Sequence, residues 1–232
     1  MTDDAGTDAV PMAGAQGSAA VDAPVEEKDD RGLIELIAAI LLGLAGLLTG
    51  YAAYYGSLAD GDSLEGYTSS QRTTADANAY YGDYAQSYTG DQQLFLQYKI
   101  KLDEGNTEIA DDIRANLFSD PLETATVAWE NQPDDENARA TPLDRDEYVV
   151  QSYLDYLETE ELAQAQFDEA KGINERGDNY GLASVFLAIA LFAAGIAALF
   201  KIRALSISLL IGSALLIVPG IWAIAKGKGW IS

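Results

Sequence analysis

Three long apolar runs constrain the fold of this chain more than any other feature. They cover residues 33–55, 181–200 and 204–225. Each is close to the roughly 20 residues that a helix needs to cross a hydrocarbon core about 30 Å thick. Glu35 is the only charged residue in the first run, and the other two contain none. The sequence therefore predicts an all-α membrane protein with three transmembrane helices.

The segments outside these runs are strongly acidic. Residues 56–180 carry 28 acidic and 8 basic side chains, a net charge of −20, and we expect them to form an acidic helical soluble domain. Residues 1–32 are acidic, rich in Ala and Gly, and without apolar periodicity, so they are expected to be a disordered tail rather than a cleaved signal peptide. Residues 226–232 form a short C-terminal tail. The acidic, Lys-poor composition is typical of proteins from halophiles.

Two stretches of the soluble domain have apolar residues at the four-three spacing of a coiled coil. The glycines at 56, 61 and 66 are expected to loosen or break the helix after the first span, and a long helix is predicted over 68–104. A second long helix, over 144–178, is predicted to begin near Leu143 and Asp144. Together they form a helical hairpin, or they pack between protomers. The seam candidates are Tyr81, Tyr84, Tyr88, Phe95, Tyr98, Tyr153, Tyr156 and Phe167.

Shorter helices are expected between the two arms. The stretch NTEIADDIRANLF places Ile109, Ile113 and Leu117 on one face of a helix. Asp120 followed by Pro121 is typical of an N-cap and a first helical position. The polar stretch NQPDDENARATP predicts a loop.

The residue inventory excludes several kinds of chemistry. The chain has no Cys and no His, so it has no disulfide, no Cys/His zinc site and no Ser–His–Asp or Cys–His nucleophile. Its acidic clusters lack the ligand spacing of a calcium loop, and they are expected to be solvated faces rather than metal sites. A polyanionic surface also repels nucleic acid. We therefore expect no enzyme activity, no cofactor and no nucleic-acid partner.

Small residues in the spans are candidates for helix packing. Gly46 and Gly50 form a GxxxG pattern, Gly43 lies on a neighbouring face, and Ala194 and Gly195 offer a similar surface on the second span. Glu35 is an intramembrane charge, expected either to pair at the membrane interface or to serve ion movement.

Tyrosines and basic residues bear on how the chain sits in the bilayer. All 13 tyrosines lie between Tyr51 and Tyr180, and those at the span ends are expected to form an interfacial aromatic belt. Lys28 and Arg31 precede the first span, and Arg72 is the first basic residue after it. This asymmetry favours a cytoplasmic N-terminus and an extracellular domain in a multi-pass protein of the cell membrane.

The layout resembles an uncharacterised family of membrane proteins, the domain of unknown function numbered 4337. The likeness lies in SSQRTTADANAYYGDYAQSY and in the paired spans VFLAIALFAAGIAALFKIRALSISLLIGSALLIV, and it covers roughly residues 33–225. The resemblance implies one span, a helical domain and two further spans. It implies no activity and no catalytic residues.

The leading functional hypothesis is a non-enzymatic, membrane-anchored helical scaffold or accessory subunit. Its expected partners are the lipid bilayer and either a second copy of the chain or another membrane protein. The alternative is an oligomeric pore or transport component, which the few polar residues in the spans disfavour. An enzyme that uses paired carboxylates is a third reading, but no pair stands out among so many acids.

Overall fold

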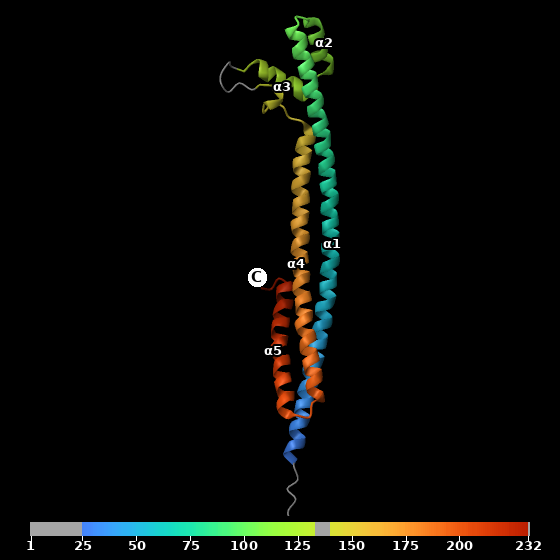
Figure 1. Cartoon of the computed structure of the whole chain (residues 1–232), viewed down its shortest axis with the longest axis vertical. Coiled ribbons are helices and arrows are strands. Elements are labelled where there is room, and N and C mark those ends of the chain that lie inside the picture. Colours follow the sequence, from blue (N-terminus) through green and yellow to red (C-terminus); the bar gives the residue numbers. More distant parts are fainter. Residues whose placement is uncertain (1–24, 133–139, 232) are drawn as a thin grey trace, which may run out of the picture.

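The protein is a long, narrow helical rod (Figure 1). A computed structural model describes residues 25–132 and 140–231, and these residues form helices and no strand. Two long helices, α1 (Val25–Asp103) and α4 (Gln151–Leu199), run antiparallel along the rod. A third long helix, α5 (Arg203–Gly227), packs beside α4 at the end where α1 begins.

Helix α1 is continuous over 79 residues and joins segments that the sequence separated. It begins at Val25, so the expectation of disorder is wrong for residues 25–32, and residues 1–24 lie outside the described part of the chain. The expected break after the first span is also wrong, because the helix passes through Gly56, Gly61 and Gly66 without interruption.

Contact with α4 explains why two of these glycines do not break the helix. A Cβ on Gly66 would lie 2.8 Å from the Cβ of Ala170, and one on Gly56 would lie 3.4 Å from the Cβ of Tyr180. Each glycine costs a helix about 1 kcal/mol relative to alanine. Here the missing side chains let two helices approach closely, and that packing offsets the cost.

Helix α4 begins later than the sequence predicted. It starts at Gln151 rather than near Leu143, which instead lies in a short 3₁₀ helix, η1 (Pro142–Asp144). Val150 is extended, with φ −97° and ψ 124°, and β-branched residues favour that conformation. Once begun, α4 continues through Gly172 and Gly177 into the second apolar run without interruption.

Helix α5 extends slightly beyond the predicted third span. It ends at Gly227 and includes Pro219, so the predicted C-terminal tail is helical in its first two residues. Gly229 has a φ of +72°, and the backbone N–H groups of Gly229 and Trp230 donate to the carbonyls of Lys226 and Ala225. Only a glycine adopts this left-handed end of a helix without strain.

Small residues recur at seven-residue steps along the contacts of the three long helices, with one step of 11 on α1, from Ala52 to Ser63, and one step of six on α4, from Gly177 to Ala183. A seven-residue repeat keeps one face toward its partner when the helices supercoil with a left hand. Small side chains at those positions let the backbones approach closely. The buried members are Ala38, Ala45, Ala52, Ser63, Ser70 and Ala77 on α1, Ala163, Ala170, Gly177, Ala183, Ala190 and Ala197 on α4, and Ser206, Ser213, Gly220 and Gly227 on α5.

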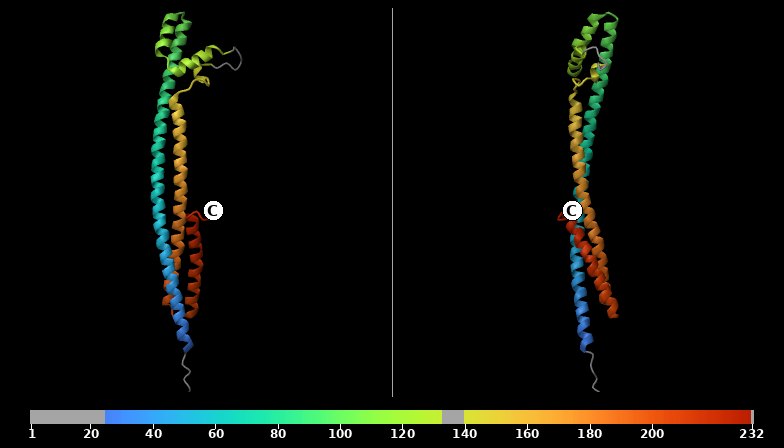
Figure 2. Two further views of the ribbon diagram at one scale, coloured as in Figure 1. Left: turned by 180° about the vertical axis from the view of Figure 1, so that it is seen from behind. Right: turned by 90° about the vertical axis from the view of Figure 1, so that its left-hand side faces the viewer.

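Two short helices, α2 (Thr107–Leu117) and α3 (Asp120–Glu130), fold onto the far end of α1 and, with η1, form a head (Figure 2). The N-cap of α3 is Ser119, one residue before the predicted Asp120, and its hydroxyl accepts from the N–H of Leu122. On α2 the buried residues are Ala110 and Ile113. Ile109 and Leu117, predicted on the same face as Ile113, are exposed.

Three described helices are long and apolar enough to cross a membrane. They are the parts of α1, α4 and α5 that contain the apolar runs. Only about a tenth of the most apolar window of α1 is buried by other parts of the chain. Exposed apolar helices of this length are compatible with a membrane protein, because they match the thickness of the hydrocarbon core.

Candidate functional site

The head at the far end of the rod is the most elaborate part of the molecule. Its core is formed by Phe95, Tyr98, Ala110, Ile113, Leu122 and Leu143. Phe95 lies edge-on to Trp129 of α3 at 5.4 Å between ring centroids, and Tyr98 lies edge-on to Phe118 at 5.3 Å. Aromatic pairs in this geometry add to the burial that holds α2 and α3 on α1.

A single arginine joins the two short helices. Arg114 of α2 donates from Nε and Nη2 to the two carboxylate oxygens of Glu123, both at 2.9 Å. Its Nη1 donates to Glu130 at 2.9 and 3.1 Å. These charged acceptors raise the pKa of Arg114, and the hydrogen bonds that Arg114 donates to Glu123 are the largest cause. Because a guanidinium forms paired, directed bonds, Arg114 fixes both the spacing and the angle of α2 and α3.

A buried carboxylate joins the head to α1. Asp91 is only 5% exposed, and its Oδ2 accepts from the Ser119 hydroxyl at 2.6 Å and from the Tyr148 hydroxyl at 2.9 Å. Burial, and then the hydrogen bond to Asp91, raise the pKa of Tyr148. Asp91 of α1 thus binds both Ser119, the N-cap of α3, and Tyr148, in the segment before α4.

Below the head, tyrosines of α1 and α4 meet in pairs. Tyr84 lies 4.8 Å from Tyr153 between ring centroids, and Tyr81 lies 5.3 Å from Tyr156. Further along, Phe167 contacts Tyr67 at 5.3 Å. The structure therefore brings Tyr81 and Tyr84 together with Tyr156 and Tyr153 within one chain. Tyr88 instead contacts Tyr148, which precedes α4, and Phe95 and Tyr98 lie in the head core.

The packing candidates in the spans have different surroundings. Ala194 is fully buried, and Cβ atoms on Gly46 and Gly195 would lie 3.5 and 3.4 Å from leucine side chains of the opposite helix. Gly43 and Gly50 face open space, so the GxxxG pair does not lie at one contact within the chain. Glu35 is exposed near the start of the first span.

Large apolar side chains are exposed on the head. Two of them, Leu96 and Ile100, are one helical turn apart on α1 and are 59% and 44% exposed. The others are Ile109, Leu117 and Val127. Such residues on a folded surface favour contact with another protein when they lie close together.

Three carboxylates of the head are engaged in hydrogen bonds. Among the described side chains of residues 32–132 and 140–231, no three acidic groups converge in a way that could bind a metal ion. The carboxylates of Asp91, Glu123 and Glu130 are each occupied by hydrogen bonds to neighbouring side chains. Chemically, these residues hold helices in place.

Sequence reasoning missed both organising residues of the head. In the sequence, Asp91 is a single polar residue within the apolar seam of the long helix predicted over 68–104, and Arg114 belongs to no motif. The partners of Asp91 lie 28 and 57 residues away, so no local pattern reveals them. The seven-residue steps of small residues are a further signal in the sequence that indicates where the long helices meet.

No family model matches this chain, and neither the curated proteins nor the solved structures searched contain a similar one. The resemblance to the domain of unknown function numbered 4337 therefore stays a prediction.

Proposed function

We propose that the chain is a non-enzymatic membrane anchor that holds its helical head away from the bilayer as a scaffold or accessory subunit. One observation carries the proposal: α1 runs unbroken from the first apolar segment to the head. From Tyr55 to Asp103 the helix is roughly 70 Å long at 1.5 Å per residue. In this reading the paired arms of α1 and α4 form a water-exposed coiled-coil stalk.

The stalk is built for stiffness rather than for chemistry. Ser70 donates from its hydroxyl to the Ala163 carbonyl at 2.8 Å, and both groups are buried between the helices. Thr73 donates to Gln166 of the opposite arm at 2.8 Å. Polar contacts inside a closely packed seam fix its register, because a shift would leave them unpaired. A stalk of fixed register suits a protein that sets a distance between a membrane and a partner.

The exposed apolar residues of the head supply the contact surface in this proposal. Leu96 and Ile100 would bind another membrane protein or a second copy of the chain. The acidic surface around them keeps the free head soluble and disfavours nucleic acid.

The pore alternative has less support. Five hydroxyl groups in the apolar runs donate to backbone carbonyls, which leaves them little capacity to line a conduction path. Ser213 in α5, for example, donates to the Ala190 carbonyl of α4 at 2.8 Å. The other donors are Thr49, Ser184, Ser206 and Ser208.

For orientation, we propose a cytoplasmic N-terminus and an extracellular head. The turn containing Lys201 lies at the same end of the rod as the start of α1, where Lys28 and Arg31 precede the first span. Cysteine is absent from the natural chain, so a single Ile100→Cys variant gives a specific label. A membrane-impermeant maleimide should label this cysteine in intact cells. Labelling only after lysis would show that the head lies in the cytoplasm and would contradict the proposed orientation.

The test of function is the native particle. The protein is extracted from its own membrane in mild detergent and high salt, and its mass and composition are measured together. We expect a partner or a second copy, and we expect Leu96→Asp with Ile100→Asp to release it. Leu64→Asp, at a 67% exposed position on the stalk, is the matched control. A particle containing a single chain would contradict the proposal.

A further inference from the structure

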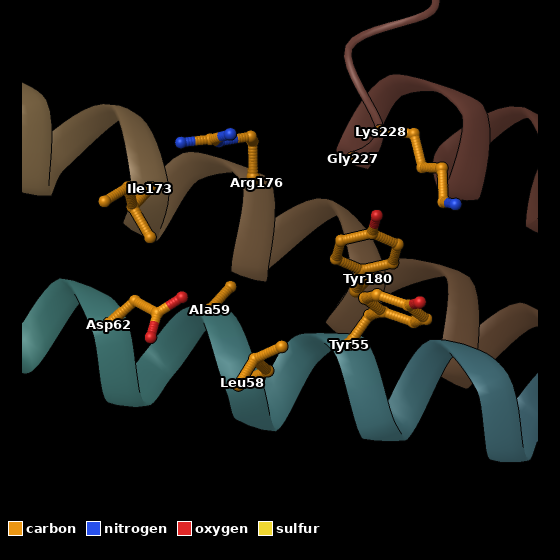
Figure 3. Close-up of a pocket in the computed structure, with 9 residues that line it drawn as sticks. All are labelled: Tyr55, Leu58, Ala59, Asp62, Ile173, Arg176, Tyr180, Gly227 and Lys228. Carbon is orange, nitrogen blue, oxygen red and sulfur yellow. The ribbon is translucent and has the colours of Figure 1, made fainter.

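A groove of about 310 Å³ opens at the level where the apolar segments end (Figure 3). All three long helices contribute to it. Leu58 and Asp62 come from α1, Ile173, Arg176 and Tyr180 from α4, and Lys228 from the end of α5.

The aromatic residues beside the groove mark its depth. Tyr55 lies 5.8 Å from Tyr180 and 4.6 Å from Tyr51 between ring centroids. Tyrosines concentrate where hydrocarbon meets headgroups, because their rings are apolar and their hydroxyls are polar. From Tyr55 to Asp62 the groove rises about 10 Å along α1, which is enough to span one headgroup layer of about 5–8 Å.

Lys228 is held at the groove by aromatic rings. Its Nζ lies 5.5 Å from the centre of the Tyr51 ring, 5.3 Å from Tyr55 and 5.4 Å from Trp230. Hydrogen bonding to Tyr51 is the largest cause that raises the pKa of Lys228 above its usual value. The ammonium therefore lies among three aromatic rings, and no salt bridge joins it to a carboxylate in the part of the chain that the structure describes.

A second cation faces the same groove. Figure 3 shows Tyr180 between Arg176 on one side and Lys228 on the other. Arg176 is exposed, and its Nε donates a long hydrogen bond of 3.4 Å to the Gly172 carbonyl. Two cations thus flank one groove in a chain whose net charge is −23. Together with Asp62 they give the lining of the groove a net charge of +1, which suits an anion.

We propose that this groove binds the headgroup of an anionic phospholipid, with its phosphate between Arg176 and Lys228. At this depth the phosphate-bearing molecules present at high concentration are the lipids themselves. Asp62, which reaches from α1 toward α4 in Figure 3, then accepts a hydrogen bond from a headgroup hydroxyl. The acyl chains follow the apolar surface below the tyrosines. The proposal rests on the membrane placement that the proposed function also uses.

The test measures which lipids stay bound. The full-length protein is placed in nanodiscs containing equal amounts of phosphatidylglycerol and phosphatidylcholine, then released for native mass spectrometry. We expect retained phosphatidylglycerol to exceed phosphatidylcholine. Arg176→Gln and Lys228→Met should each lower that retention by about tenfold, which corresponds to about 1.4 kcal/mol, because each removes a charged hydrogen-bond donor to the phosphate. Methionine keeps an apolar chain among the rings.

Lys171→Gln is the matched control, because it removes one positive charge from the same helix one turn from the groove. Retention should be unchanged in this variant, and melting temperatures should show that all variants fold. Equal loss in Lys171→Gln would mean a diffuse charge effect and would overturn the proposal, as would equal retention of the two lipids. Displacement of the lipid by about 10 mM inorganic phosphate would show that the groove binds free phosphate and would overturn the lipid proposal. A native particle without a partner would refute the proposed function but leave these results intact.

Discussion

At the scale of single residues, the structure depends on a few polar groups that bridge segments far apart in the sequence. Asp91 is the clearest, because its buried carboxylate accepts from Ser119 and Tyr148 and so joins α1, α3 and the start of α4. Hydrogen bonds to a charged acceptor are worth about 1.5–3 kcal/mol, and leaving a buried charge unpaired costs more. The head should therefore respond to changes at these three residues more than to changes at its exposed carboxylates.

The pKa of Tyr148 gives a pH prediction. Because burial and Asp91 raise that pKa in the folded state, the folded protein holds the proton more tightly than the unfolded chain. The resulting stabilisation is fully present below the ordinary tyrosine value of about 10 and is lost as the pH rises toward the higher folded value.

We therefore expect the melting temperature of the natural protein to fall more between about pH 8 and pH 11 than that of Tyr148→Phe, at about 2–4 °C per kcal/mol. Tyr80→Phe, at a position that is 39% exposed, is the control and should behave like the natural protein. If Tyr148→Phe loses stability with pH as steeply as the natural protein, the link between Tyr148 and Asp91 contributes nothing measurable.

At the scale of elements, the large residues revealed the pairing of α1 and α4, but the small residues determine how closely they pack. Tyr84 and Tyr153 face one another as their spacing predicted. The expected breaks at Gly56 and Gly66 were wrong because helix propensity is local, whereas those glycines fit against α4. Helix α4 begins at Gln151 rather than near Leu143, and the segment before it is tied to α1 by the hydrogen bond from Tyr148 to Asp91, which no local pattern shows.

Two glycines of α1 test this packing directly. Gly66→Ala places a Cβ 2.8 Å from that of Ala170, so the helices must separate, and we expect a loss of about 1–3 kcal/mol. Gly61→Ala points into open space in the same helix and should gain up to about 1 kcal/mol from better propensity. Thermal unfolding in detergent measures both. Equal effects of the two substitutions would mean that the contact at Gly66 is not close in solution.

At the scale of the whole molecule, the sequence predicted the helical class and the three apolar helices. It did not predict that the first apolar helix continues without a break into the long helix of the soluble part. Apolar runs and heptads are local patterns, so they predicted α4 and α5 within a few residues of most of their ends. The head and the groove depend on Arg114, Asp91 and Lys228, whose partners come from other elements. These contacts exist only once the rod has formed.

The central claim is that one unbroken α1 holds the head away from the bilayer, and a single distance tests it. Spin labels on Leu58→Cys and Ile100→Cys, both at exposed positions, report the length of the stalk in a nanodisc by pulsed electron resonance. A continuous helix places the labels about 60 Å apart with a narrow distribution. A broad distribution, or one centred well below that distance, would show that the glycines break the helix and would contradict the account.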